Sequence, residues 1–204
     1  MRRGGWFLVF AFVAIWSVTG HGFNLLETAG PVGAQQVALT FGFGLGTTEL
    51  SAAGVWFLTP QGRLTIGLME RLDVGVQSGW KTEIGAGVGK WLGVLVDAKV
   101  ASVHVPDGYT LAWGAGGGYG LDLLGNGWGV FWQILFESHS PLLPVFATYR
   151  STLPFDGTVG GSIAFEGYIA GGLCLRLAPI ARLLLVVDIH RGLASIGLGL
   201  EIAF

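Results

Sequence analysis

The residues best suited to chemistry gather in one short stretch, Glu137-Ser138-His139-Ser140. A serine beside a histidine and a carboxylate is the set that nucleophilic acyl transfer uses, with the imidazole taking the hydroxyl proton. Here the serine and histidine adjoin one another beside Pro141, in a stretch that reads as a loop. We therefore interpret them as polar loop residues rather than as a catalytic site.

Other reactive side chains stand apart from one another. Cys174 is the single cysteine, so it forms neither an intramolecular disulfide nor a zinc site with other cysteines. His190 is expected to pair with Asp188 rather than to act as a base, and His104 stands at a loop mouth. The common phosphate, dinucleotide, serine-hydrolase and zinc-protease motifs do not occur. The sequence thus predicts no enzyme activity, no cofactor and no metal.

The composition restricts the class of protein. Of 204 residues, 51% are apolar, only 12% are charged and 36 are glycine. Ordinary soluble domains carry about twice as much charge, and neither collagen nor disorder fits this sequence. No stretch reaches the ~18 to 20 apolar residues of a spanning helix. The net charge of −2 also gives no basic surface for nucleic acid.

The first residues resemble an export signal. Arg2 and Arg3 precede an apolar stretch over 6–18, and small residues follow it. Thirteen residues rise only about 20 Å as a helix, which is too short for an anchor in a hydrocarbon core of about 30 Å. The sequence predicts a cleaved signal peptide over 1–22, an irregular lead-in over 23–35 and one domain over 36–204.

The remaining chain alternates between apolar and small or polar residues. At its end, Leu198, Leu200, Ile202 and Phe204 alternate with Gly199, Glu201 and Ala203, which is the period of a β-strand. A soluble antiparallel sandwich also alternates, but its solvated face is rich in lysine, glutamate and threonine. The second face here is mostly glycine and alanine with isolated charges, as expected for the interior of a barrel whose outer face contacts lipid. A closed barrel crosses lipid without helices because it pairs every backbone group.

By parity, the charged residues of the strands fall on the small-residue face. The expected lumen-lining residues are Arg63, Asp73, Lys81, Glu83, Asp97, Lys99, Asp122, Glu166, Arg176, Arg182, Asp188, His190 and Glu201.

The fold class expected is therefore all-β, a transmembrane antiparallel up-and-down barrel of about ten strands, with eight or twelve as alternatives. Residues 47–61 and 137–157 are expected as external loops, and the strand-like pieces at 53–58 and 145–152 within them are the reason for the alternative of twelve strands. The ten strands are expected at 36–46, 62–68, 72–79, 82–90, 93–103, 109–122, 127–136, 158–177, 182–190 and 195–204.

The ladder Leu198, Leu200, Ile202 and Phe204 resembles the C-terminal signal of Gram-negative outer-membrane barrels, which the barrel-assembly machinery recognises. The stretch 67–76 and the lead-in 23–29 are similar to elements of poorly characterised barrels of that group. The resemblance implies a bacterial outer-membrane location, with lipid and the assembly machinery as partners. It implies no active-site residue. Lipid A deacylases of this class place histidine and serine two apart on a strand, unlike His139.

Aromatic residues are expected near strand ends, as in membrane-interface girdles. They are Trp56, Trp80, Trp91, Trp113, Trp128, Trp132, Tyr109, Tyr119, Tyr149 and Tyr168. Ten strands enclose a lumen that side chains nearly fill, so the sequence favours a non-enzymatic, structural or porin-like barrel with a narrow passage for small solutes. Three alternatives remain: a transporter of hydrophobic ligands, a lipid-modifying enzyme and a soluble exported sandwich. The first is suggested by apolar residues that are expected to face inward, namely Leu95, Phe131, Leu135, Leu184 and Val186.

Overall fold

A computed structural model describes residues 27–47, 56–85, 89–120, 127–155, 166–190 and 193–204. The described residues form ten strands and no helix. The strands are β1 (Val37–Thr47), β2 (Trp56–Met69), β3 (Leu72–Glu83), β4 (Gly89–His104), β5 (Tyr109–Gly120), β6 (Gly127–Ser138), β7 (Val145–Pro154), β8 (Glu166–Ala178), β9 (Ala181–His190) and β10 (Leu193–Ala203).

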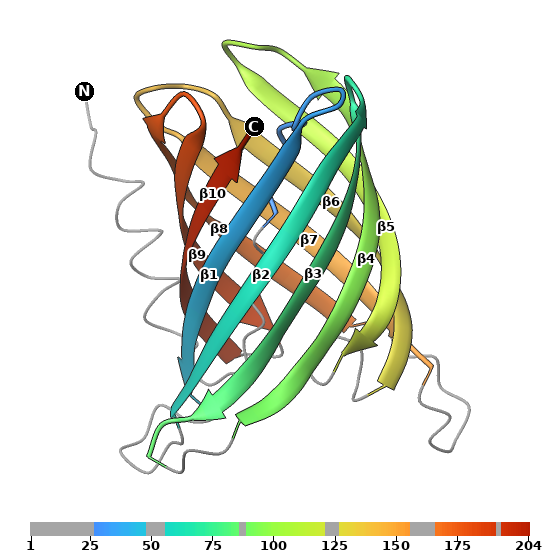
Figure 1. Cartoon of the computed structure of the whole chain (residues 1–204), viewed down its shortest axis with the longest axis vertical. Coiled ribbons are helices and arrows are strands. Elements are labelled where there is room, and N and C mark those ends of the chain that lie inside the picture. Colours follow the sequence, from blue (N-terminus) through green and yellow to red (C-terminus); the bar gives the residue numbers. More distant parts are fainter. Residues whose placement is uncertain (1–26, 48–55, 86–88, 121–126, 156–165, 191–192) are drawn as a thin grey trace, which may run out of the picture.

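The ten strands close into one antiparallel barrel in which each strand pairs with its neighbours in sequence (Figure 1). The closing pair joins β1 to β10, with Thr40 opposite Glu201 and Gly46 opposite Ser195. This arrangement confirms the expected ten-strand antiparallel barrel and replaces the sandwich alternative, because one closed sheet has no second sheet to pack against. No helix in the described part of the chain is long and apolar enough to span a membrane.

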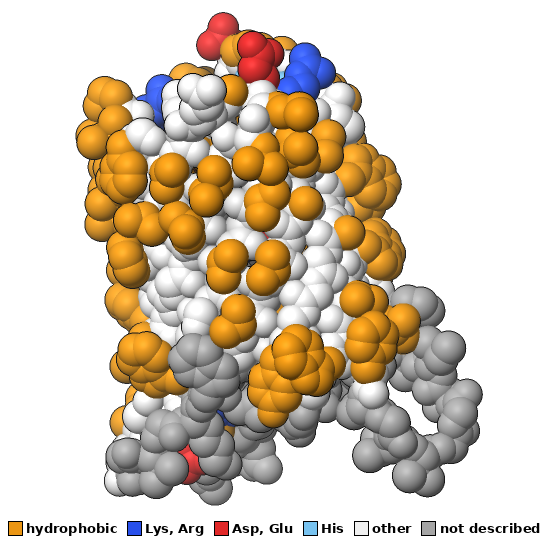
Figure 2. All heavy atoms as spheres, turned by 45° about the vertical axis from the view of Figure 1, so that its right-hand side comes forward, with side chains coloured by type: hydrophobic (Ala, Val, Ile, Leu, Met, Phe, Trp, Pro, Cys, Tyr) orange, Lys and Arg blue, Asp and Glu red, His pale blue; other side chains and the backbone are white. Residues whose placement is uncertain are grey.

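Alternation along each strand separates two faces of opposite character. In β2, exposed Leu64 and Ile66 alternate with buried Arg63 and Thr65. Successive side chains of a strand point to opposite faces, so the period of two places Leu64 and Ile66 outside and Arg63 and Thr65 inside. Figure 2 shows the consequence: apolar side chains cover the barrel wall between its ends, and acidic and basic side chains appear at the upper end of the view.

Short connections gather at one end of the barrel. The turn at Glu70 and Arg71, the connections 105–108 and 139–144, and the turn at 179–180 all lie there, together with the start of β1 and the end of β10 (Figure 1). We name this end the short-turn end. β5 ends and β6 begins at the opposite end, and residues 121–126 between them lie outside the described residues.

Two errors in the predicted strand boundaries cancel in the count. Residues 82–90 are not a separate strand: β3 ends at Glu83, and Gly85, with a φ of 97°, lies in a turn that the alternation of glycines conceals. The expected loop 137–157 instead contains the strand β7. Of the strand predicted over 158–177, the described part belongs to β8, and residues 158–165 lie outside the described residues. The expected loop 47–61 likewise contains the first residues of β2. The alternatives of eight and twelve strands are both wrong.

Candidate functional site in the barrel interior

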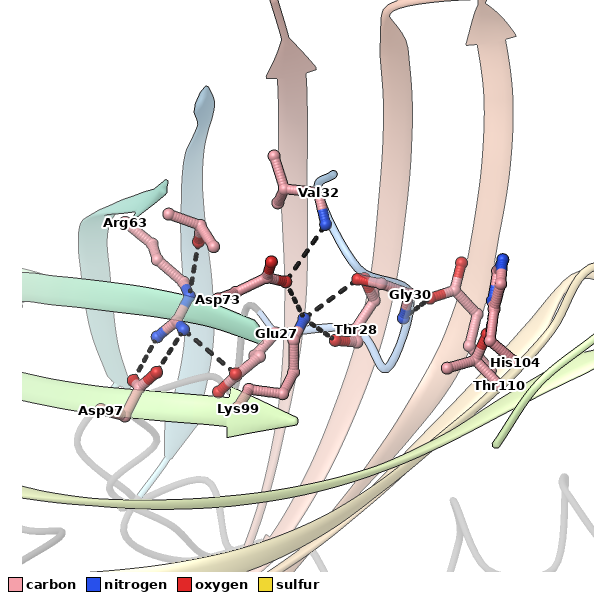
Figure 3. A network of polar contacts seen from close by, with 12 residues as sticks. Glu27, Thr28, Gly30, Val32, Arg63, Asp73, Asp97, Lys99, His104 and Thr110 are labelled. Carbon is pink, nitrogen blue, oxygen red and sulfur yellow. Dashed lines mark hydrogen bonds and ion pairs between the residues drawn. The ribbon is translucent and has the colours of Figure 1, made fainter. Parts of the chain in front are cut away.

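The interior of the barrel holds a segment of the chain's own N-terminal region. Residues 27–33, which we name the luminal segment, precede β1 without regular structure, and Glu27, Thr28 and Ala29 are buried. These residues belong to the expected lead-in over 23–35, and no sequence pattern there indicates that they enter the barrel. Three groups of wall residues hold the segment there, and Figure 3 shows Arg63, Asp73, Asp97 and Lys99 around it.

The deepest group surrounds the carboxylate of Glu27. Arg63 on β2 contacts Glu27 with Nη2 at 3.1 Å, and the same guanidinium forms a bidentate pair with Asp97 on β4 at 2.7 Å for both bonds. On the other side, Gln133 Nε2 donates to Glu27 at 2.6 Å, and Arg150 Nη2 lies 3.5 Å from the same carboxylate oxygen. We name Glu27, Arg63, Asp97, Gln133 and Arg150 the central cluster. The bidentate pair with Asp97 holds the Arg63 guanidinium in place, and Glu27 is then contacted by β2 on one side and by β6 and β7 on the other.

A second group binds the backbone of the luminal segment. Lys99 Nζ donates to the carbonyl oxygens of Thr28 at 2.8 Å and Gly30 at 3.0 Å, and it pairs with Asp73 at 3.3 Å. The Asp73 carboxylate in turn accepts a bond from the backbone N–H of Val32 at 3.1 Å. One lysine and one aspartate thus satisfy both donors and acceptors of a segment that has no strand to pair with.

The third group lies nearer the short-turn end. Glu137 accepts a bond from the backbone N–H of Gly30 at 2.7 Å and pairs with Arg182 Nη1 at the same distance. Arg182 also bonds Glu201 through Nε at 2.8 Å and donates to the Thr28 hydroxyl at 3.2 Å. The segment is therefore tied to β6 and β9 by this group, and to β2, β3, β4, β6 and β7 by the other two.

Gly67 makes space for the chain where it enters. A Cβ atom added to Gly67 would lie 1.8 Å from the carbonyl oxygen of Gly33, well inside van der Waals contact. Around it, Gln35 N donates to Gly67 O at 2.8 Å and Gly67 N donates to Gln36 O at 2.9 Å. Only glycine allows the backbone to approach β2 this closely.

The stretch 137–140 does not form the serine–histidine pair that nucleophilic catalysis would require. His139 Nε2 instead lies 2.7 Å from the Thr110 hydroxyl, whose oxygen also lies 2.8 Å from His104 Nδ1, and His139 Nδ1 lies 3.8 Å from Glu137. In the described part of the chain, neither Ser138 nor Ser140 hydrogen-bonds to His139, and Thr110 is fully buried. A hydroxyl that no substrate reaches is a poor nucleophile, so the contacts favour a structural role.

Burial lowers the pKa of His139 below its ordinary value of 6.5; the Glu137 carboxylate opposes this shift, while His104, Arg182 and Arg176 add to it. A histidine whose pKa is lowered on folding contributes stability that is complete above the unfolded value and is lost as pH falls through it. Protonation of His139 is therefore expected to reduce the free energy of unfolding below about pH 6.5.

We expect the urea midpoint of the folded protein to fall between about pH 7 and pH 5, and to fall less steeply in His139→Gln. Glutamine keeps a polar group beside Thr110 without the ionisation. Equal slopes in the two proteins would contradict the role given to His139.

The structure places most of the expected lumen-lining residues on the inner face. Arg63, Asp73, Lys81, Asp97, Lys99, Asp188 and Glu201 are buried there, and Glu83 and Arg182 are half-buried near the ends of their strands. Arg176 lies at the end of β8 and is exposed. Asp122 lies outside the described residues, as do the side chains of Glu166 and His190, so the expected pair of His190 with Asp188 is not described.

Part of the inner wall is apolar. Arg150 stacks over the Phe131 ring with 4.2 Å between its Cζ and the ring centroid. A cluster of buried residues continues from there, formed by Leu95, Phe131, Phe146, Tyr168, Ala170, Cys174, Leu184 and Val186. Tyr168 therefore faces the interior, and its expected place in an aromatic girdle is wrong.

The expected lumen-lining set does not contain Glu27 of the luminal segment or three of the wall residues that contact the segment, Gln133, Glu137 and Arg150. Arg150 lies in β7 and Glu137 near the end of β6, both within the expected loop 137–157. Alternation over 145–152 was the signal that could have placed Arg150. Nothing in the local pattern around Glu27 indicates that it enters a barrel.

The described residues include no group of three histidine, cysteine, aspartate or glutamate side chains placed to hold a metal ion. No family model matches the sequence, and no curated protein matches it either. Among solved structures, the chain is similar to one described as "De novo design of transmembrane beta-barrels", at 10% identity and a TM-score of 0.38. The match covers 84% of this chain and 97% of that one. At these values the similarity concerns the arrangement of strands alone.

Proposed function

We propose that this chain is an integral membrane barrel with a closed interior, located in a bacterial outer membrane and without enzymatic activity. The observation that carries the proposal is the inverted polarity of the barrel. Arg63, Asp97, Lys99 and Arg150 are at most 3% exposed inside, whereas the outer face exposes large apolar side chains on all ten strands of the described chain. A water-soluble barrel would do the reverse, because apolar surface is driven out of water and charges are drawn into it.

The strand lengths agree with this proposal. The strands have 10 to 16 residues, and β3 has 12. At about 3.3 Å per residue and a tilt of about 45°, twelve residues cross about 28 Å, close to the thickness of a hydrocarbon core.

Aromatic side chains mark one edge of the outer face. Trp56, Trp80, Tyr119 and Trp128 are exposed and lie at the strand ends opposite the short-turn end. Their rings are apolar while their N–H and O–H groups reach water, so they stabilise a boundary between lipid and water. Trp113, Trp132 and Tyr149 lie mid-strand and are exceptions to the expected placement near strand ends.

The outer-membrane location is supported by the C-terminal ladder. Leu198 and Leu200 of β10 face outward, and β10 pairs with both β9 and β1 to close the barrel. A strand that closes the sheet is a suitable element for an assembly machinery to recognise by strand addition. Outer-membrane lipid and this machinery are therefore the partners we propose.

The closed interior supports a structural role, with a narrow passage for small solutes only when the luminal segment moves. In a planar bilayer we expect little steady conductance from the wild-type protein. The double variant Lys99→Met/Glu137→Gln removes contacts to Thr28 and Gly30 and weakens the contact to the Gly30 N–H, so it should spend more time in a conducting state.

Arg71→Gln is the matched control, because Arg71 is exposed in the turn after β2 and makes no contact with the luminal segment in the described part of the chain. An equal open fraction in all three proteins would contradict the role of the luminal segment as the closing element. Failure of every protein to enter the bilayer would contradict the proposed location instead.

A further inference from the structure

Arg150 has an unusual set of partners for a buried guanidinium. It is 1% exposed, and its Nε and Nη2 atoms both donate to one oxygen of Gln133, at 2.9 and 2.6 Å. Its carboxylate contact is Glu27, at 3.5 Å, and Nη1 has no hydrogen-bond partner among the described residues. A buried N–H without a partner is costly, so this arginine is only partly satisfied by the groups around it.

Glu27 supplies the carboxylate that balances the charge of Arg150 in the central cluster. Asp97 faces Arg63 in a bidentate pair, and both belong to the barrel wall. Arg150 is also part of the wall, but the carboxylate that balances it comes from the luminal segment. Without Glu27, the wall residues of the central cluster therefore present two guanidinium groups against one carboxylate, and all three are buried.

The donors around Glu27 converge on one carboxylate. Gln133 Nε2 donates at 2.6 Å, Arg63 Nη2 lies at 3.1 Å and Arg150 Nη2 at 3.5 Å (Figure 3 shows the contact with Arg63). A guanidinium edge matches the two oxygens of a carboxylate. A free carboxylate is not held by a peptide chain and can turn to accept from both Nη1 and Nη2 of Arg150, which Glu27 does not do.

We propose that Arg63, Gln133 and Arg150 form a binding site for a small monocarboxylate anion, which the side chain of Glu27 occupies in this structure as a tethered ligand. The inference deepens the proposed function, because it names the class of solute that the barrel interior accepts when Glu27 leaves. The carboxylate site itself does not depend on the proposed function. Only the route by which the anion reaches the site, through the barrel interior, depends on it.

The test is chemical rescue of Glu27→Ala. This variant removes the carboxylate and leaves space for acetate beside the three donors. In purified protein, sodium acetate should raise the unfolding temperature saturably, by an amount on the order of 5 °C, relative to sodium chloride at equal ionic strength. Glu27→Gln is the matched control: it fills the space without charge, so acetate should have no specific effect on it.

A second control locates the binding site. In Glu27→Ala/Arg150→Met the surplus charge is gone, and the response to acetate should be lost. An acetate effect no larger than that of chloride in folded Glu27→Ala, or an equal effect in the two controls, would overturn the proposal.

Folding of the variant is itself a usable readout. If Glu27→Ala folds poorly, the folding yield replaces the unfolding temperature, and acetate must raise that yield above the value in chloride for the proposal to stand. Acetate rescue does not depend on the membrane. Rescue in a protein that fails to enter bilayers would therefore contradict the proposed location and leave the carboxylate site in place.

Discussion

Val96→Arg is expected to destabilise the barrel in lipid by about 2–4 kcal/mol, the cost of an arginine on the lipid face near the bilayer midplane. Val96 lies in the middle of β4 and is 48% exposed on the outer face. In water the same substitution of an exposed side chain would change stability by no more than about 0.5 kcal/mol. Urea unfolding of the vesicle-embedded protein measures the difference.

Leu177→Arg is the matched control. Leu177 is at least as exposed, but it lies at the end of β8, where an arginine side chain reaches the headgroups and costs about 0–1 kcal/mol. The dependence on depth separates lipid from any other apolar surroundings of the outer face. Equal costs at the two positions would count against a lipid-facing wall.

Arg63→Met is expected to reduce stability by about 3–5 kcal/mol, because removal of one partner leaves charged groups buried without compensation. Asp97 would lose its bidentate partner, and Glu27 would keep only Arg150 among its described cationic contacts. Methionine fills similar volume, so the loss reports the charge rather than a cavity.

A second substitution checks the cause of that loss. In Arg63→Met/Asp97→Asn the unbalanced carboxylate becomes a neutral amide, and much of the lost stability should return, since interacting sites are not additive. Arg71→Met, on the exposed turn, should change the urea midpoint little. A double variant no more stable than Arg63→Met would show that the Arg63–Asp97 pair is not the source of the effect.

The sequence predicted well which wall residues face inward, because the side chains of a strand always alternate between its two faces. A charge at Arg63, Asp73 or Asp97 between apolar neighbours is placed on one face by parity alone, whatever the exact ends of the strand. The apolar inner residues Leu95 and Leu184 follow by the same rule, and the structure buries both.

Strand boundaries were less predictable for two reasons. The alternation of residue types can continue into a turn, and it can be weak within a real strand. Gly85 continues the pattern of β3 into a turn. In β7 the small residue Ala147 is exposed on the outer face, while Phe146 faces inward, so the contrast between the two faces is weak. The polar and proline-rich stretch before it adds to the appearance of a loop.

The luminal segment was not predictable from local pattern. Glu27 has no periodic neighbours, and its partners Arg63, Gln133 and Arg150 come from three strands distant in sequence. Contacts of this kind follow from the closure of the barrel rather than from the residues around Glu27. The site therefore depends on the tertiary structure and has no local sequence pattern.

The central claim is that the outer face of the barrel contacts lipid. Nitroxide labels on cysteines introduced at Val96 and Val130, both exposed and apolar, test it most directly in a Cys174→Ala background reconstituted in vesicles. A label at Glu70, in the exposed turn, gives the reference for water. We expect the labels at Val96 and Val130 to collide with dissolved oxygen and to be shielded from a water-soluble nickel complex. Collision with the nickel complex as frequent as at Glu70 would contradict it.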